Sequence, residues 1–284
     1  MKSGQGMHVF KSRIVGFLGQ CIQIKNKFWP SQPVPICLEW GHCWLAIEDY
    51  LSFCLRYGIP FEVGERRFLS RWLKKDWVIF DIGAHHGFYS LLFSHYGGQV
   101  TAFEPSQRAQ SRLREHLKIN ACANVRAENL GLGSFVQTQP IYVCDGMESG
   151  RSSFRPPLVS EKLRTEEASV RTLDGYILEK SIQRLDFIKI DTEGSEMAIL
   201  RAAPRALEFL RPVIMCELAD WVLENWNYRG KDILSYLQQF NYCFFSFQKN
   251  GKLRPFHNQG ELNENILAVP SEKSDLVLSF VESQ

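Results

Sequence analysis

The stretch VIFDIGAHHGFYS, residues 78–90, decides how the chain folds. An apolar run leads into Asp81, a short turn bracketed by two glycines follows, and a helix-like run begins at Phe88. In an open α/β sheet this pattern is a buried parallel strand that enters a helix through a tight loop, where nucleotide-like ligands bind. The loop lacks the G-x-G-x-x-G pattern, which disfavours a dinucleotide.

The sequence beyond this stretch alternates between strand-like and helix-like runs. Further strands are predicted at 100–104, 125–128, 185–191 and 213–217, with helices at 65–73, 88–96, 105–119, 196–203 and 231–240 and another that begins at Leu173. The stretch from 129 to 172 is irregular in pattern. Alternation at this spacing predicts a doubly wound, mostly parallel sheet with right-handed crossovers.

The C-terminal part has a different pattern. Strand-like runs at 243–248 and 266–269 lie on either side of Asn250-Gly251, a strong two-residue hairpin signal. An antiparallel pair is therefore expected to close the parallel sheet.

Residues 1–60 show no clear period and are rich in aromatic side chains. They are predicted to form an N-terminal cover segment on a main α/β domain at 61–284. The apolar run 14–24, flanked by basic residues, is too short to span a bilayer. A plain packing helix is favoured there over a helix that lies on a membrane surface, and no transmembrane segment is expected.

Composition narrows the partners and the compartment. The chain has 284 residues and a formal net charge of +2, which gives no electrostatic footprint for nucleic acid. Its eight cysteines include no C-x-x-C pair, so a zinc site is disfavoured. A chain of this size does not need disulfides, so reduced thiols and a cytoplasmic location are predicted. Oligomeric state has no signal in the sequence.

Acids at the ends of the first two strands indicate the ligand. Glu104 can accept hydrogen bonds from both hydroxyls of a ribose. Asp81 suits a ligand contact or, equally, the N-cap of a helix. A carboxylate beside the loop would repel pyrophosphate and would suit a ligand that carries an ammonium and a sulfonium. S-adenosylmethionine is such a ligand.

A third group of acids follows the strand at 185–191. Asp191 ends that strand, Glu193 and Glu196 come within one turn, and Glu217 ends the next strand. These carboxylates predict a site for a polar substrate or for proton removal. The alternatives are a helix N-terminus stabilised by Glu193 and Glu196, and a divalent cation site. No metal is predicted.

Taken together, these motifs resemble the FkbM family of S-adenosylmethionine-dependent methyltransferases. The resemblance spans roughly residues 60 to 270 and rests on D-x-G-A-x-x-G-F-Y-S from Asp81, F-E-P at 103–105 and I-K-I-D-x-E-G-x-E from 188 to 196. Supporting matches are Phe61-Glu62, Asn120, Asn124, Leu173-Asp174, Pro212, Glu217 and Asn265. The family implies a seven-stranded Rossmann-like sheet and, usually, O-methylation of a hydroxyl on a sugar or polyketide-like product.

The resemblance also implies that Asp81, Gly83 and Glu104 hold the cofactor. Two positions depart from the family pattern, because His85 and His116 stand where asparagine is common. Solvent-facing loop histidines are the alternative for His85 and His86. The full predicted cofactor set is Asp81, Gly83, Ala84, His85, Gly87, Glu104 and Asn129, in which Asn129 is a candidate adenine contact.

For the chemical step, Asp191 is predicted to act as the base or to orient the substrate, with Glu193 and Glu217 behind it. Ser152 and Ser153 are candidate substrate contacts. The predicted acceptor is a small-molecule or glycan hydroxyl. A non-catalytic cofactor-binding protein of the same fold is the main alternative, and a nicotinamide-dependent oxidoreductase is the less favoured one.

Overall fold

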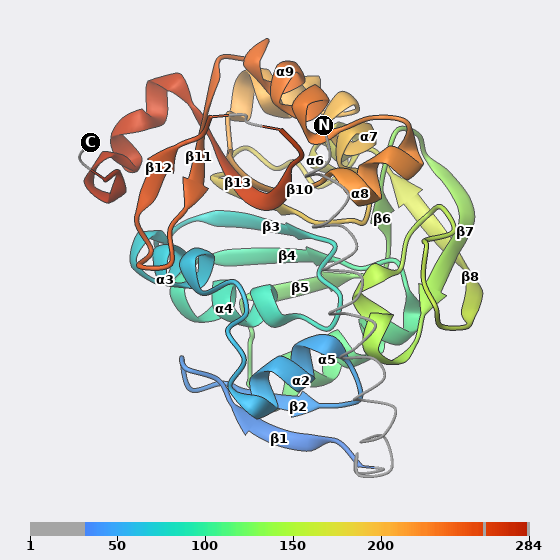
Figure 1. Cartoon of the computed structure of the whole chain (residues 1–284). Coiled ribbons are helices and arrows are strands. Elements are labelled where there is room, and N and C mark those ends of the chain that lie inside the picture. The colour runs from blue at the N-terminus through green and yellow to red at the C-terminus, as the bar shows by residue number, and fades with distance from the viewer. Residues whose placement is uncertain (1–31, 258–259, 283–284) are drawn as a thin grey trace, which may run out of the picture.

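A central sheet organises the computed structural model, which describes residues 32–257 and 260–282 (Figure 1). Its strands run in the order β12-β11-β13-β10-β9-β3-β4-β5. In chain order they are β3 (Val78–Ile82), β4 (Gln99–Phe103), β5 (Val125–Glu128), β9 (Phe187–Ile190), β10 (Val213–Ala219), β11 (Tyr242–Phe247), β12 (Leu253–Pro255) and β13 (Asn263–Pro270).

The order and directions of the strands confirm the predicted α/β class. β10, β9, β3, β4 and β5 pair in parallel, and β13 pairs antiparallel with both β10 and β11. All seven predicted strands are present in the described sheet. The hairpin predicted at Asn250-Gly251 adds an eighth, because β12 pairs antiparallel with β11. Gly251 adopts a φ of +77° in that turn, which favours glycine.

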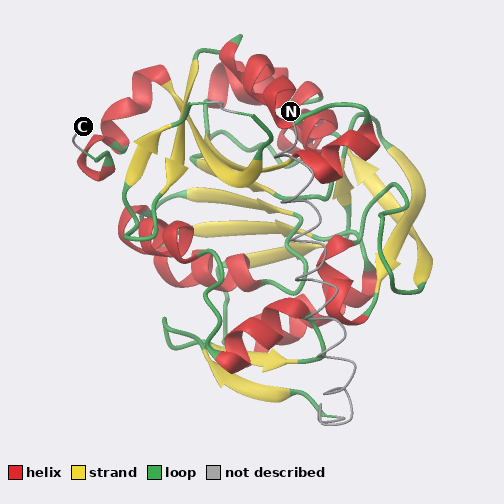
Figure 2. Cartoon of the chain, viewed as in Figure 1, coloured by secondary structure: helices red, strands yellow, loops and turns green. Residues whose placement is uncertain are grey.

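Helices cover both faces of the sheet (Figure 2). α3 (Val63–Trp72), α4 (Phe88–Tyr96) and α5 (Gln107–Ile119) contribute to a core with Ile79 and Phe187. α6 (Leu173–Glu179), α7 (Glu196–Arg201) and α9 (Gly230–Gln238) contribute to another with Phe80 and Ile188. Neighbouring residues of the strands thus enter opposite cores, which is why the strands read as continuous apolar runs.

Several short helices complete the chain. They are α8 (Asp220–Leu223), a π-helix η3 (Ala206–Leu210), and the 3-10 helices η2 (Gly146–Arg151), η4 (Glu224–Trp226), η5 (Ser271–Leu276) and η6 (Leu278–Phe280).

The stretch expected to be irregular is instead a second sheet, so that prediction was wrong. β6 (Gly131–Leu132), β8 (Leu163–Arg171) and β7 (Gln137–Cys144) lie in the order β6-β8-β7. Ile141, Val143 and Ala168 form its small buried cluster. The charged and polar residues on its other positions hide the apolar alternation that would have indicated strands.

The N-terminal part of the described chain forms a hairpin and a helix. β1 (Val34–Cys37) pairs antiparallel with β2 (Cys43–Ala46), and α2 (Tyr50–Tyr57) follows. Trp44 of β2 is fully buried in the core that also holds Phe88 and Leu113. The run 14–24 lies outside the described residues, and the division at residue 60 stays a prediction. Among the described residues, no helix has both the length and the apolar character needed to cross a membrane.

Candidate active site

The loop after β3 comes into backbone contact with the end of β9. Gly83 has a φ of +83°, and a Cβ atom placed on it would lie 1.8 Å from the carbonyl oxygen of Asp191. The Gly83 and Ala84 amides both donate to the carbonyl of Phe103, at 3.1 and 3.0 Å. The loop is therefore fixed between the ends of β4 and β9, and only glycine fits at its start.

The end of the loop is equally restricted. Gly87 has a φ of +92° and is the N-cap of α4. A Cβ atom there would lie 2.4 Å from Cδ1 of Leu113. The loop therefore needs glycine at both ends for different reasons. At Gly83 a backbone carbonyl lies too close for a Cβ atom, and at Gly87 a side chain of α5 does.

Asp81 lies fully buried at the end of β3. Its Oδ2 accepts a hydrogen bond from the Ser90 hydroxyl at 2.5 Å, whereas Oδ1 has no partner among the described residues. Burial raises the pKa of this carboxyl, and the Lys189 ammonium opposes that rise. Because Gly87 caps α4, Asp81 is not the N-cap of that helix, and its Oδ1 keeps an unused hydrogen-bonding capacity although Asp81 lines neither of the two hollows described below.

Glu104 follows β4 and is held by two backbone amides. The His85 amide donates to Oε2 and the Ser106 amide donates to Oε1, each at 2.8 Å. Burial raises the pKa of Glu104 to about 7. Its carboxyl therefore has a fixed position, with capacity left on each oxygen for further hydrogen bonds.

Glu104 lines a strand-end hollow of about 530 Å³, counted with the solvent at its mouth. Gly83, His85, Pro105, Leu132, Ser153 and Asp191 are among the other lining residues. The second sheet supplies Leu132 and Ile141 to the wall, so the segment that the sequence left without structure helps to close the hollow.

Asn129 is oriented toward the backbone. Its side-chain amide donates to the carbonyls of Glu104 and Pro105, at 3.0 and 3.1 Å, and it does not line the hollow. This bonding explains how the Glu104-Pro105 turn is held in place. An adenine contact for Asn129 stays a prediction.

The predicted catalytic acids lie together. Carboxylate oxygens of Asp191, Glu193 and Glu217 all lie within 4.8 Å of one another, and each residue is partly buried. Burial and the Asp191 carboxylate raise the pKa of Glu193 to about 8 and that of Glu217 well above its ordinary value. Such a group can hold protons or receive one from a hydroxyl.

Glu196 is not part of this carboxylate group and instead stabilises the neighbouring loop. Its Oε1 accepts hydrogen bonds from the amide and hydroxyl of Thr192, both at 2.8 Å, and its Oε2 accepts one from the Tyr228 hydroxyl at 3.0 Å. These bonds brace the loop that carries Glu193, which has a φ of +55°. The Ser153 hydroxyl donates to the Glu193 carbonyl at 2.7 Å and adds a second brace.

Two further residues of the site, the buried Lys189 and the partly buried Glu62, have no role in the sequence-based prediction. Lys189 is 3% exposed, and its ammonium lies 2.9 Å from Asp191 Oδ2 and 4.8 Å from the centre of the Tyr89 ring. Glu62 accepts hydrogen bonds from the Tyr89 hydroxyl at 2.5 Å and the Asn265 amide at 3.0 Å. Burial raises the pKa of Glu62 to about 7. For Lys189 the sequence does contain a signal: a lysine between two isoleucines of a buried strand needs a partner of opposite charge.

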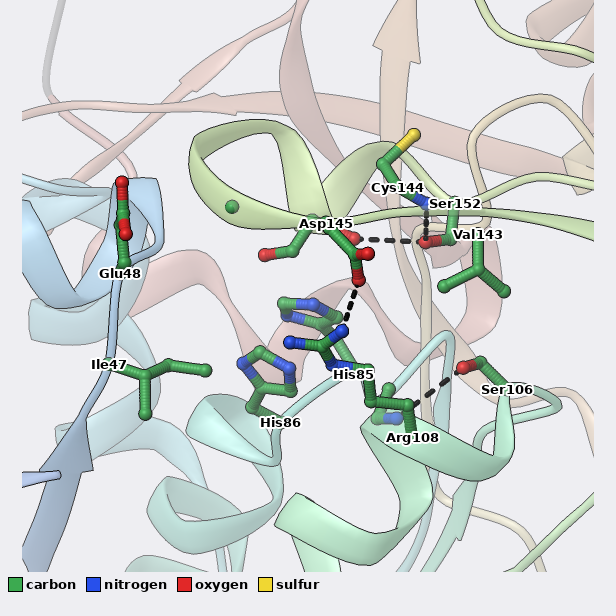
Figure 3. A pocket seen from close by; sticks show the side chains of 13 residues that line it. Ile47, Glu48, His85, His86, Ser106, Arg108, Val143, Cys144, Asp145 and Ser152 are labelled. Atoms are coloured by element: carbon green, nitrogen blue, oxygen red, sulfur yellow. Dashed lines mark hydrogen bonds and ion pairs between the residues drawn. The ribbon is translucent and has the colours of Figure 1, made fainter. Parts of the chain in front are cut away.

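His86 of the histidine pair is buried, whereas His85 is partly buried at the edge of two hollows, so neither residue is a fully solvent-facing loop histidine. The rings of His85 and His86 stack with centres 3.6 Å apart, and burial lowers the pKa of each to about 3. Nε2 of His85 is buried and has no partner among the described residues. Figure 3 shows both rings beside a second hollow, where Arg108 pairs with Asp145. His85 and Ser152 line both hollows.

The fold and this edge of the sheet together define a class: an open α/β protein with a nucleoside-type site at the carboxyl ends of its parallel strands. The model of the methyltransferase FkbM domain matches residues 81–244. The chain therefore belongs to the FkbM methyltransferase family, whose cofactor is S-adenosylmethionine. The resemblance noted in the sequence is thereby confirmed.

Solved structures with related folds are distant in sequence. A methyltransferase FkbM from Methylobacillus flagellatus KT is 16% identical, with a TM-score of 0.48, and the match covers 75% of this chain but 49% of that one. Precorrin-6y C5,15-methyltransferase from Geobacter metallireducens GS-15 is 15% identical, with a TM-score of 0.43 and coverage of 74% and 88%. TrmK of M. capricolum, solved with S-adenosylhomocysteine, is 11% identical, with a TM-score of 0.40 and coverage of 75% and 69%. A comparison with curated proteins gives no match.

The residues present fit S-adenosylmethionine. Gly83 keeps the loop free of side-chain atoms, and Glu104 offers a fixed carboxyl. Asp81 and His85 each have a buried polar atom with no partner in the described part of the chain. Buried polar atoms of this kind cost free energy until a ligand or water satisfies them.

Proposed function

We propose that this protein is an S-adenosylmethionine-dependent O-methyltransferase that acts on a hydroxyl of a sugar or secondary-metabolite-like small molecule. The observation that carries the proposal is the Glu104 carboxyl, fixed by two backbone amides at the wall of the strand-end hollow. A carboxylate there suits the two hydroxyls of a ribose.

The charge of the site supports this cofactor. The carboxyls of Asp81, Asp191 and Glu193 lie at or near the strand ends with Lys189 as their buried cationic partner. An ammonium and a sulfonium would be attracted to this excess of carboxyls, whereas the pyrophosphate of a nicotinamide cofactor would be repelled. Asp81, whose Oδ1 has no partner within the described residues, is the one we assign to the ammonium.

When bound, the cofactor supplies an activated methyl group on a sulfonium. The protein then has to align the acceptor oxygen and remove its proton. Alignment can account for about 7–11 kcal/mol of a barrier, and a general base for about 10²–10⁴-fold in rate. We assign the base to Asp191, which Lys189 holds at 2.9 Å. Glu193 and Glu217 would orient the acceptor hydroxyl.

The side chains near the carboxyls assigned to the acceptor favour a hydroxylated ring as the methyl acceptor. The Arg151 guanidinium lies 4.5 Å from the centre of the Trp221 ring, and its charge acts on Glu193. Trp221 is 36% exposed and follows Glu217 closely in the chain. Carboxylates for hydroxyls and an indole for an apolar ring face are complementary to a sugar or polyketide-like acceptor.

Isothermal titration calorimetry with S-adenosylmethionine and S-adenosylhomocysteine tests the cofactor. We expect Glu104→Gln to weaken binding by roughly ten- to hundredfold, the range of a hydrogen bond to a charged group. Equal affinity in the variant would remove the ribose assignment. Incubation with methyl-labelled cofactor and a cell extract, followed by identification of the product, tests the reaction. A labelled nitrogen in the product would contradict O-methylation.

Reduced cysteines and a cytoplasmic location stay part of the proposal. The seven cysteines in the described part of the chain are all free thiols. A metal requirement is not proposed, and turnover in the presence of a chelator would test that point for the Asp191-Glu193-Glu217 group.

A further inference from the structure

His116 of α5 uses both ring nitrogens on backbone groups. Nε2 accepts a hydrogen bond from the Leu45 amide at 3.0 Å, and Nδ1 lies 2.7 Å from the His86 carbonyl oxygen. A carbonyl only accepts, so Nδ1 carries the proton and donates to it. The ring is therefore neutral with one defined tautomer, which agrees with the lowering of its pKa by burial.

The N-terminal hairpin holds this ring in place. Trp44 of β2 stacks on His116, with ring centres 4.1 Å apart, and is itself anchored by a hydrogen bond to the Ser52 hydroxyl at 2.9 Å. Asn120, the C-cap of α5 one turn after His116, bonds to the amide and carbonyl of Cys43 at 2.6 and 2.8 Å. Two side chains of α5 thus bind β2, and of these two His116 also reaches the cofactor loop.

That loop needs an external restraint. His85 has a φ of +49°, a left-handed conformation that is strained for a residue other than glycine. Such strain persists only where surrounding contacts impose it. Glu104 restrains the His85 amide on one side, and His116 restrains the His86 carbonyl on the other.

We propose that His116 is a positioning residue for cofactor binding: its hydrogen bond to the His86 carbonyl holds the 83–87 loop in its binding form. This rests on the proposed function, because the loop is the cofactor loop only if that function is correct.

Two substitutions separate the two bonds. The amide of Asn reaches the place of Nδ1, so His116→Asn keeps a donor for the His86 carbonyl and loses the Leu45 bond. The amide of Gln reaches the place of Nε2, so His116→Gln keeps the Leu45 bond and loses the loop bond. Asn120→Ala is the matched control, since it weakens the β2 contact without touching the loop.

The first readout is affinity for S-adenosylhomocysteine by calorimetry, with thermal unfolding in parallel. We expect His116→Gln to bind about tenfold more weakly, as for one lost buried hydrogen bond, and His116→Asn to bind like the wild type. Asn120→Ala should lower Tm and leave affinity unchanged. Equal affinity in the Gln variant, or an equal loss in the Asn120→Ala control, would overturn the proposal.

The second readout is hydrogen exchange of the amides at 83–87 in the cofactor-free protein. We expect faster exchange of the His85 amide in His116→Gln and unchanged exchange in the other two variants. Unchanged exchange in the Gln variant would overturn the positioning role. Absence of cofactor binding in the wild type would instead overturn the proposed function, so the two failures are distinguishable.

Discussion

The ammonium of Lys189 lies 2.9 Å from Asp191 Oδ2, and Lys189 is also the cross-strand neighbour of Asp81. One buried cation therefore serves the residue assigned to the cofactor and the residue assigned to the acceptor. Removing one partner of a buried ion pair costs about 3–5 kcal/mol. Lys189 is therefore the cation that offsets the negative charge of the buried carboxyls at this edge of the sheet.

We predict that Lys189→Met lowers the free energy of unfolding by roughly 3–5 kcal/mol, because the carboxylates around it lose their partner. Urea denaturation would measure this change. Lys189→Arg, which keeps the charge, is the control and should lose less. A Met variant as stable as the wild type would show that the carboxyls do not need this cation.

Asp191→Asn should reduce turnover by about 10²–10⁴-fold, the usual contribution of a general base. Its amide keeps the shape of the side chain, so cofactor affinity should stay close to that of the wild type. Single-turnover kinetics beside calorimetry separates the two quantities. Wild-type turnover in this variant would move the base to another carboxyl, with Glu193 the next candidate.

Gly83→Ala should abolish cofactor binding. The new Cβ would lie 1.8 Å from the Asp191 carbonyl oxygen, so the backbone of one loop has to move. Overpacking of this kind typically costs about 1–3 kcal/mol, and Tm should fall with it. Gly133→Ala is a suitable control, because Gly133 does not line the strand-end hollow and a Cβ there would approach only a side-chain atom, Cγ1 of Val170, at 3.1 Å. Normal affinity in the Gly83→Ala protein would contradict the observed approach of the two loops.

Stability should fall as pH rises toward neutrality in the cofactor-free protein. Burial raises the pKa of Glu104 from 4.5 to about 7, so between these values the folded state keeps a proton that the unfolded state has lost. The slope from this group is then negative, about 1.4 kcal/mol per pH unit. Denaturation midpoints across that window would measure it, and Glu104→Gln should have a shallower slope. An unchanged slope would mean that Glu104 does not titrate there.

The main sheet was predictable because buried parallel strands leave unmistakable apolar runs, such as 78–82 and 187–190. The loop glycines and the acids at strand ends were equally visible, since ligands bind at that edge in this fold class. Strands β7 and β8 were missed because much of their surface is solvated, and their charged residues mask the alternation.

The parts of the site that escaped prediction depend on contacts between distant segments. Glu62 and Asn265 are separated by 203 positions in the chain, and the His116 bond to Leu45 joins two elements 71 positions apart. No local pattern records such a pairing. The departure from the family pattern at His85 and His116 was visible, but the role of His116 depended on Trp44 of β2, which stacks on its ring.

The pairing of Asp81 with Lys189 has a consequence for how the chain folds. Both residues point to the face of the sheet whose other strand positions, including Ile79 and Phe187, are apolar. A shift of one strand by a single residue would turn its charge into the opposite core, away from its partner. Misaligned pairings of β3 and β9 would therefore separate these two charges, whose attraction opposes the rise in the pKa of Asp81. The buried charges of the site thus also favour the correct alignment of β3 with β9 as the sheet assembles.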